Sequence, residues 1–278
     1  MEQTYDIRVV GLDLDGTVFD DQKTISARNR AAITEACRRG VQVLPATGRP
    51  LNAVPEEFLS IPGVRYALTS NGARVIDLTT GESVVELLVD KELALTALRE
   101  LSRFDGSMDV FWRGKAYAEP KNIRLAADRT VPELRRYIFD SRVAVDDLPA
   151  WLAQQDQGPE KITMFFADPA ERERCRIAAE ALGLTVSSSL PANLEMNGPG
   201  VDKGRGLLAL AGALGFGPGQ VMACGDSGND TAMLLAAGLG VAMANSTPDI
   251  LAVADAVTGS NNESGVAQAI EKYVLNCQ

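Results

Sequence analysis

The chain has 278 residues, of which 46% are hydrophobic, and a formal net charge of −10. This length suits one large domain or two smaller ones. The excess of acidic residues argues against binding to nucleic acid or to an anionic membrane through bulk charge, although a local cation could still attract an anionic substrate. The sequence contains no histidine, which excludes imidazole catalysis and histidine-bound zinc. Acid–base chemistry must therefore come from carboxylates, Lys, Tyr or Cys.

The sequence contains four widely spaced cysteines and no Cys-x-x-Cys pair; they are Cys37, Cys175, Cys224 and Cys277. This spacing indicates reduced thiols rather than a metal cluster, as is usual in a cytoplasmic protein. The N-terminus lacks a signal-peptide pattern, and no apolar run is long enough to span a membrane. We therefore expect a cytoplasmic protein without membrane contact.

The first part of the chain alternates between apolar strands and helices. Residues 7–12 form an apolar run long enough for one buried strand, which ends in Asp13-Leu14-Asp15-Gly16-Thr17. Ser26 can cap a helix that stops at Gly40. The further predicted elements are strands at 41–46 and 66–69 and a hairpin of 75–76 with 84–89. Alternating strands and helices at this spacing predict a parallel sheet with helical crossovers.

From about Ser83 to Leu190 this alternation gives way to a different mixture of strands and helices. The predicted elements are a helix capped by Asp90, paired strands at 108–112 and 115–119, a strand at 161–166, a helix over 169–182 and a strand at 185–190. The stretch 123–158 is interrupted by prolines and predicts no clear element. We interpret residues 84–189 as an α+β domain inserted between two parts, 1–83 and 190–278, of the first domain.

The parallel pattern resumes after the insertion. The predicted elements are strands at 193–196, 221–224 and 239–244 and helices at 201–214, 233–237, 248–253 and 265–274. The predicted fold class is therefore α/β, with a Rossmann-like parallel-sheet core and an inserted α+β domain.

Polar side chains follow the strands or open the helices of the predicted core. They form four segments: Asp13 with Asp15; Thr47-Gly48-Arg49; Lys203; and Asp226 with Asn229 and Asp230. Ligands of parallel sheets bind at the carboxyl ends of the strands, where paired acids suit a cation or phosphate chemistry. Each segment alone also fits a structural role, such as an Asp-Gly turn, a helix cap or a solvated lysine. Their chemistry and order together favour one shared site.

These four segments resemble the four motifs of haloacid dehalogenase-like (HAD) phosphatases. Asp13-Leu14-Asp15-Gly16-Thr17 is similar to the first motif, Ala46-Thr47-Gly48-Arg49 to the second, Lys203 to the third, and Gly225-Asp226-Ser227-Gly228-Asn229-Asp230 to the fourth. The resemblance spans nearly the whole chain. It is strongest to the Cof-type branch, in which a cap domain lies between the second and third motifs, as residues 84–189 do here.

The resemblance implies a role for each motif residue. Asp13 would be the nucleophile that forms an aspartyl-phosphate, and Asp15 would protonate the leaving alcohol and then deprotonate water. Mg²⁺ would be the cofactor, held by the Asp13 and Asp226 carboxylates and the Asp15 carbonyl, with Asp230 as a supporting metal group. The predicted phosphate-binding residues are Thr47, Gly48, Arg49 and Asn229, and Lys203 would neutralise charge in the transition state. Asn229 could instead orient Asp230.

Substrate choice should come from the inserted domain, because the core residues would bind only phosphate and metal. The candidate side chains for the leaving group are Trp112, Arg113, Lys115 and Tyr117, with Lys161 as a weaker candidate. An ordinary exposed strand pair would explain the first four equally well. Asn71, after the third strand, is interpreted as structural or facing the cap.

The predicted function is Mg²⁺-dependent hydrolysis of a small phosphate monoester, such as a sugar phosphate. A phosphomutase that returns the phosphoryl group to a sugar is the alternative enzyme, although the resemblance counts against it because mutases of this family have a different second motif. A regulatory or binding protein that retains the fold without turnover is a third interpretation. The expected partner is a small phosphorylated metabolite, not nucleic acid or a membrane.

Overall fold

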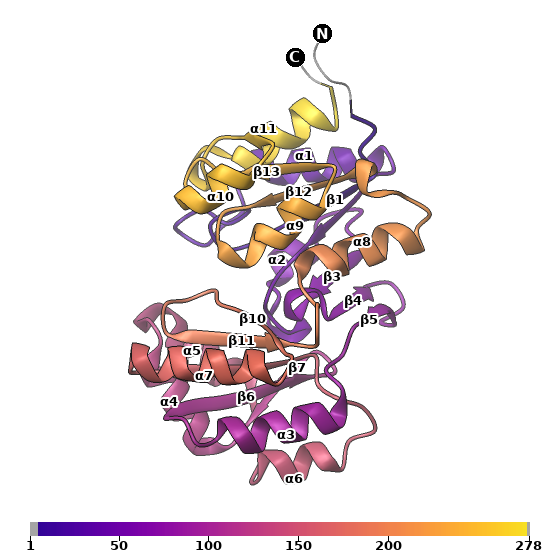
Figure 1. The fold of residues 1–278 in the computed structure, drawn as a ribbon. Helices are drawn as coiled ribbons and strands as arrows, with labels where there is room; N and C mark the ends of the chain where they lie inside the picture. The colour runs from indigo at the N-terminus through magenta and orange to yellow at the C-terminus, as the bar shows by residue number, and fades with distance from the viewer. Residues whose placement is uncertain (1–4, 277–278) are drawn as a thin grey trace. The chain divides into compact units, whose positions relative to one another are not determined.

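The computed structural model describes residues 5–276, which fall into two compact units (Figure 1). Unit 1 contains the chain up to Thr47, Val54–Glu86 and the chain from Asp202 onwards, and unit 2 contains Gly48–Ala53 and Leu87–Val201. The sequence predicts crossings between domains after residues 83 and 189. The chain instead crosses after Glu86 and Val201 and also at both ends of Gly48–Ala53.

A parallel sheet forms the centre of unit 1. Its order is β14-β13-β12-β1-β2, and each neighbouring pair is parallel. The strands are β1 (Val9–Leu12), β2 (Gln42–Pro45), β12 (Val221–Gly225), β13 (Leu239–Ala242) and β14 (Ala256–Val257). The predicted parallel core is confirmed. The short β14, for which the sequence predicts no strand, adds to the edge of the sheet beside β13.

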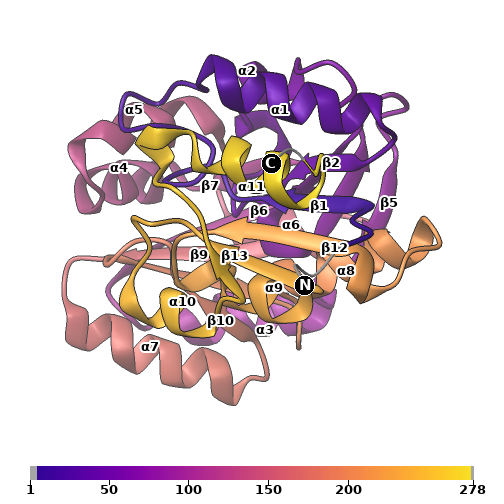
Figure 2. The same cartoon turned by 90° about the horizontal axis from the view of Figure 1, so that it is seen from above.

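Helices cover both faces of this sheet (Figure 2). The helices of unit 1 are α1 (Ala27–Arg38), α2 (Glu56–Leu59), α8 (Lys203–Ala213), α9 (Thr231–Ala236), α10 (Pro248–Val253) and α11 (Gly265–Tyr273). Val10 and Leu12 share one buried cluster with residues of α1 and α11. Gly11 lies between them in the strand, so its α-carbon faces the opposite side of the sheet. A Cβ at this position would lie 2.7 Å from the Leu207 side chain of α8. Successive residues of β1 are therefore buried against opposite helical layers.

Short turns and a second small sheet complete unit 1. Strands β3 (Tyr66–Thr69), β4 (Arg74–Asp77) and β5 (Ser83–Glu86) form an antiparallel sheet. A single parallel bridge, Ala46 with Leu68, connects β3 to the chain that follows β2. The 3-10 turns of the unit are η2 (Ser70–Gly72), η3 (Pro218–Gln220), η4 (Gly228–Asp230) and η5 (Asn261–Glu263).

Unit 2 is built on a second sheet of order β10-β11-β9-β6-β7-β8. Its strands are β6 (Gly106–Trp112), β7 (Lys115–Ala118), β8 (Arg142–Ala144), β9 (Lys161–Phe166), β10 (Thr185–Ser187) and β11 (Asn193–Asn197). The prediction that residues 193–196 return to the parallel sheet is wrong, because β11 pairs antiparallel with β9. A short run of buried residues carries no signal for its partner, and this pairing moves the boundary to Val201.

The two faces of the unit 2 sheet differ in chemistry. Met108, Ile162 and Met164 belong to an apolar cluster with residues of α3 (Lys91–Leu101), α6 (Leu148–Ala153) and α7 (Pro169–Ala181). The alternate residues face the other way. There, Phe165 packs against α4 (Pro120–Arg129) and α5 (Pro132–Ser141), while its neighbours on the same face are buried polar residues: Asp109, Lys161, Thr163 and Glu195.

The segment Gly48–Ala53, which includes the turn η1 (Leu51–Ala53), belongs to unit 2. None of the helices in residues 5–276 is long and apolar enough to cross a membrane. Cys37, Cys175 and Cys224 are free thiols, whereas Cys277 lies outside the described residues.

Candidate active site

The first motif lies where β1 leaves the parallel sheet. The amide of Asp13 donates to the Cys224 carbonyl at 3.0 Å, which continues the ladder between β1 and β12 by one residue. The chain then turns, because the amides of Val18 and Phe19 return to the Leu14 carbonyl at 3.0 and 2.9 Å. Asp13 is consequently buried, whereas 42% of the Asp15 side chain is exposed.

Lys203 joins the first motif to the fourth. It is the first residue of α8, whose N-cap is Asp202, and it is completely buried. Its ammonium donates to Asp13 Oδ1 at 2.6 Å and to Asp230 Oδ1 at 2.7 Å. An ammonium without such partners would be costly to bury. The structure therefore brings together three of the predicted site residues through one cation.

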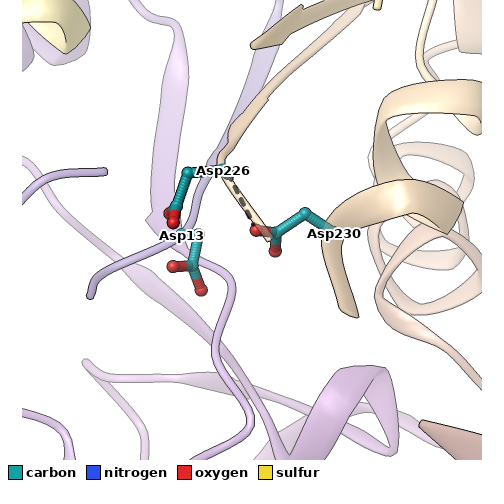
Figure 3. Close-up of side chains that lie close together, drawn as sticks. All are labelled: Asp13, Asp226 and Asp230. Carbon is teal, nitrogen blue, oxygen red and sulfur yellow. Dashed lines mark hydrogen bonds between the residues drawn. The ribbon is translucent and has the colours of Figure 1, made fainter. Parts of the chain in front are cut away.

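Asp230 also organises the loop that carries Asp226. Its Oδ2 accepts from the amide of Asp226 at 3.0 Å (Figure 3). The same oxygen accepts from the amide of Ser227 at 3.1 Å. The hydroxyl of Thr17 in the first motif donates to Asp226 Oδ1 at 2.8 Å. Position 16 must be glycine, because its φ of +85° is left-handed and a Cβ would lie 2.5 Å from Asp226 Oδ2. Glycine at position 16 thus admits the Asp226 carboxylate.

The carboxylates of Asp13, Asp226 and Asp230 form one acidic cluster (Figure 3). Each offers an oxygen within 4.8 Å of the others, an arrangement that could hold a metal ion. Burial raises the pKa of Asp13 well above its ordinary range, and repulsion from Asp230 adds to this effect while Lys203 opposes it. Burial likewise raises the pKa of Asp226 to about 6, against the hydrogen bond from Thr17. The cluster is therefore short of positive charge.

The pKa of Lys203 is also raised, but for a lysine this favours the charged form, whereas for Asp13 and Asp226 it disfavours the charged form. Burial disfavours the charged form of Lys203, but Asp13 and Asp230 outweigh it, so the pKa of Lys203 is raised. One firmly protonated ammonium faces three carboxyl groups, so ionisation of all three would give the site a net negative charge. A divalent cation bound by hard oxygen ligands would restore the balance.

Thr47 of the second motif lies beside the first motif in unit 1. The amide of Ala46 donates to the Leu12 carbonyl at 2.7 Å, and the amide of Thr47 donates to the Leu68 carbonyl at 3.0 Å. The amide of Asn71 in turn donates to the Thr47 carbonyl at 3.1 Å, with Asn71 in a left-handed conformation at φ 57°. This contact fits the structural interpretation of Asn71. Gly48 and Arg49, by contrast, belong to unit 2.

Other predicted residues have contacts of their own. The amide oxygen of Asn229 accepts from the Ser227 hydroxyl at 2.9 Å, so its part in phosphate binding stays a prediction. In unit 2, Trp112 and Tyr117 form an aromatic group with Trp151, in which Tyr117 and Trp151 stack at 4.1 Å. Arg113 pairs with Asp156 at 2.6 Å. Both alternatives for this hairpin, leaving-group contact and an ordinary strand pair, therefore stay predictions.

Sequence reasoning overlooked two residues of the site. Thr17 stands inside the first motif, and a hydroxyl beside two acids could have indicated a hydrogen-bond donor to a carboxylate. Lys23 donates from its ammonium to Asp15 Oδ1 at 2.9 Å. It does so from a turn in which it adopts a left-handed φ of 60°. Nothing in the polar stretch 20–23 predicts that conformation for a lysine.

Comparison with known proteins gives a consistent result. The family model described as haloacid dehalogenase-like hydrolase matches residues 10–270. The chain is 32% identical over 274 residues to the 5-amino-6-(5-phospho-D-ribitylamino)uracil phosphatase YcsE of Bacillus subtilis, covering 97% of both chains. It is 28% identical over 275 residues to the pyridoxal phosphate phosphatase YbhA of Escherichia coli, covering 96% of this chain and 99% of the relative.

A solved structure agrees with this relationship. A haloacid dehalogenase-like hydrolase from B. subtilis superposes with a TM-score of 0.82 at 28% identity, over 95% of this chain and 99% of the other. The family model and the sequence relatives both span nearly the full described length, and the four motif segments lie within the matched residues. The chain therefore belongs to the haloacid dehalogenase-like hydrolases.

Proposed function

We propose that this protein is a Mg²⁺-dependent phosphatase that hydrolyses a small phosphate monoester, such as a sugar phosphate or a similar metabolite, through an aspartyl-phosphate on Asp13. The observation that carries the proposal is the buried group in which Lys203 contacts both Asp13 and Asp230 beside Asp226. Its acidic residues come from distant parts of the chain. Apolar residues would fill the same space without the cost of burying charge, so packing does not explain them.

Asp13 is the proposed nucleophile. Its carboxylate oxygen forms a bond to phosphorus while the bond from phosphorus to the ester oxygen breaks, and the leaving oxygen takes a proton from Asp15. Asp15 then accepts a proton from water, whose oxygen attacks the phosphorus of the aspartyl-phosphate and releases inorganic phosphate. The partial exposure of Asp15, at 42% of its side chain, supports a role in exchanging protons with substrate and water.

The donor set suits a hard divalent ion. The carboxylates of Asp13 and Asp226 would hold Mg²⁺ together with the Asp15 carbonyl. Both oxygens of Asp230 already accept hydrogen bonds, from Lys203 and from two backbone amides, which supports a part in orienting Asp226 rather than direct ligation. When bound, the ion would offset the repulsion between the carboxylates and the phosphate dianion.

The remaining motif residues have proposed parts in holding the phosphoryl group. The Thr47 hydroxyl and the Gly48 amide would donate to its oxygens, with Arg49 and Asn229 as further donors, and Lys203 would neutralise charge that develops in the transition state. The burial of Thr47 and Lys203 supports this assignment, because electrostatic stabilisation is stronger where water is excluded.

Leaving-group choice is proposed to depend on unit 2. Relatives of similar identity are named for different esters, a ribitylaminouracil phosphate and pyridoxal phosphate. Membership of the family therefore leaves the substrate open, as expected when function depends on the site rather than the fold. Residues of the inserted unit are free to vary without disturbing the acidic cluster.

A screen of phosphate monoesters with and without Mg²⁺ tests the proposal. We expect release of inorganic phosphate from one or more esters, loss of activity in EDTA and its return with added Mg²⁺. Metal-independent hydrolysis of an aryl phosphate would contradict the proposed site. Isomerisation of a sugar phosphate without phosphate release would instead identify a phosphomutase.

A further inference from the structure

Lys161 is buried at the start of β9, on the polar face of the unit 2 sheet. Only 1% of its side chain is exposed. Its shortest contact is not to an acid: the ammonium donates to the carbonyl oxygen of Gly48 at 2.6 Å. Glu195 on the neighbouring strand lies at 3.3 Å, and the ammonium sits 4.5 Å from the centre of the Phe111 ring. A buried cation is therefore aimed at a backbone carbonyl.

The carbonyl that Lys161 binds belongs to the segment Gly48–Ala53. Unit 2 holds this segment at further points: the amide of Asn52 donates to the Gly114 carbonyl at 3.0 Å, and the Arg49 guanidinium lies 5.2 Å from the centre of the Tyr137 ring. The hydrogen bond from Lys161 reaches the first residue of the segment, Gly48, which directly follows Thr47.

Gly48 has particular need of such a contact. Without a Cβ it has more backbone freedom than any other residue, and it loses more conformational entropy when it is fixed. A charge-assisted hydrogen bond to its carbonyl restricts the rotation of the peptide that follows. The amide of the same residue is the one proposed to donate to a phosphoryl oxygen.

We infer that Lys161 is a positioning residue of the second motif, which fixes the Gly48 backbone so that its amide is preorganised for a phosphoryl oxygen. The role of the Gly48 amide in this inference rests on the proposed function. The anchoring of the Gly48 backbone by Lys161 does not. Packing alone does not explain a lysine here, because an aliphatic side chain would fill the space without the cost of burying a charge.

Hydrogen exchange measured by mass spectrometry tests the anchoring without reference to activity. In Lys161→Met we expect the peptide covering Gly48–Ala53 to exchange at least about tenfold faster, the factor that corresponds to one lost hydrogen bond of ordinary strength. Glu195→Gln is the matched control, because it removes the ion pair and leaves the bond to Gly48. The double variant Lys161→Met/Glu195→Gln avoids an unpaired buried acid if the single variant folds poorly.

Kinetics then test the consequence. The inhibition constant of inorganic phosphate and the KM for an aryl phosphate should rise about tenfold in Lys161→Met and in the double variant, with kcat changed much less, since uniform binding is lost. Glu195→Gln should leave these values near those of the unchanged protein. Unchanged exchange in the segment would overturn the anchoring. Faster exchange with an unchanged phosphate constant would overturn the positioning role.

Failure of the proposed function gives a different result. If the unchanged protein neither hydrolyses aryl phosphate nor binds inorganic phosphate, the exchange experiment still decides whether Lys161 anchors Gly48, and the positioning role is rejected together with the phosphatase.

Discussion

Each unit of the molecule buries a lysine, but the two lysines have different partners. Lys203 in unit 1 donates to two carboxylates at 2.6 and 2.7 Å. Lys161 in unit 2 donates to a neutral carbonyl at 2.6 Å and has one carboxylate, Glu195, at 3.3 Å. Burial is nearly complete for both, so their environments differ in charge rather than in solvent exposure.

The pKa values of the two ammonium groups shift in opposite directions. Burial lowers the pKa of Lys161, and attraction to Glu195 does not fully offset it while Arg142 adds repulsion. For Lys203 the same burial is outweighed by Asp13 and Asp230, and the pKa is raised. Lys203 is thus the charge partner of an acidic site, whereas Lys161 serves as a hydrogen-bond donor to the backbone.

Removing the nucleophile should give the largest effect. In Asp13→Asn the amide oxygen can still accept from Lys203, so we expect the fold to persist while turnover falls at least about a thousandfold, because the covalent step is lost. The measurement is phosphate release at saturating ester. Asp249→Asn, a change of an exposed acid in the same unit, is the control. Substantial activity in Asp13→Asn would assign the nucleophile elsewhere.

Replacing each lysine by methionine compares the two environments directly. Lys203→Met leaves two buried carboxylates without their cation and should lower the free energy of unfolding by about 3–5 kcal/mol. Lys161→Met should cost less, about 1–3 kcal/mol, because Glu195 keeps a hydrogen bond from the Ser189 hydroxyl at 2.8 Å. Denaturant titration measures both values.

The tryptophans separate the two units in this experiment. The chain has two, Trp112 and Trp151, and both lie in unit 2. The denaturation midpoint measured by their fluorescence should therefore fall in Lys161→Met and change much less in Lys203→Met. The far-ultraviolet circular dichroism, which reports the helices of both units, should change in both variants. Equal losses in the two variants would remove the distinction between charge partner and backbone anchor.

The acidic cluster should make the metal-free protein less stable at neutral pH than in mild acid. The pKa of Asp226 is raised to about 6 from an ordinary 3.8, so the folded protein holds this proton more tightly than the unfolded chain does. The free energy of unfolding should therefore fall as pH rises through that interval. Asp226→Asn should remove this part of the dependence and stabilise the metal-free protein at neutral pH by about 1–3 kcal/mol.

Thermal unfolding in EDTA at about pH 5 and about pH 7.5 checks this prediction, since the two values bracket the raised pKa. Asp226→Asn should also lose activity with Mg²⁺ present. An unchanged or lower melting temperature for Asp226→Asn at neutral pH would contradict the idea that the ionised Asp226 carboxylate destabilises the metal-free fold.

The sequence was sufficient for many helices and strands of both units because their signals are local. The Ser26 hydroxyl oxygen caps α1 by accepting a hydrogen bond from the Asn29 amide, and the Asp90 carboxylate caps α3 by accepting one from the Leu93 amide. Strand partners and long-range contacts are not local. The membership of β11 in unit 2 depends on pairing with β9, and the anchoring of Gly48 depends on a lysine far along the chain. No pattern within a short window encodes either.

The smallest predicted effect concerns Lys23, whose bond to Asp15 the polar stretch 20–23 did not reveal. The Asp20 side chain holds this turn, accepting from the amide and hydroxyl of Thr24 at 2.9 and 2.7 Å. If Lys23 fixes one oxygen of Asp15 so that the other can protonate the leaving group, Lys23→Met should lower kcat/KM for an alkyl phosphate by about five- to tenfold, within the range of general acid catalysis.

An aryl phosphate with a good leaving group distinguishes this role from a general loss of structure. A nitrophenolate departs with little help from an acid, so kcat/KM for such an ester should change much less in Lys23→Met. Arg38→Met, which removes an exposed ion pair of α1, should leave the ratio of the two esters unchanged. An equal fall for both esters would mean that Lys23 supports the turn without orienting Asp15, because only the orienting role depends on the basicity of the leaving oxygen.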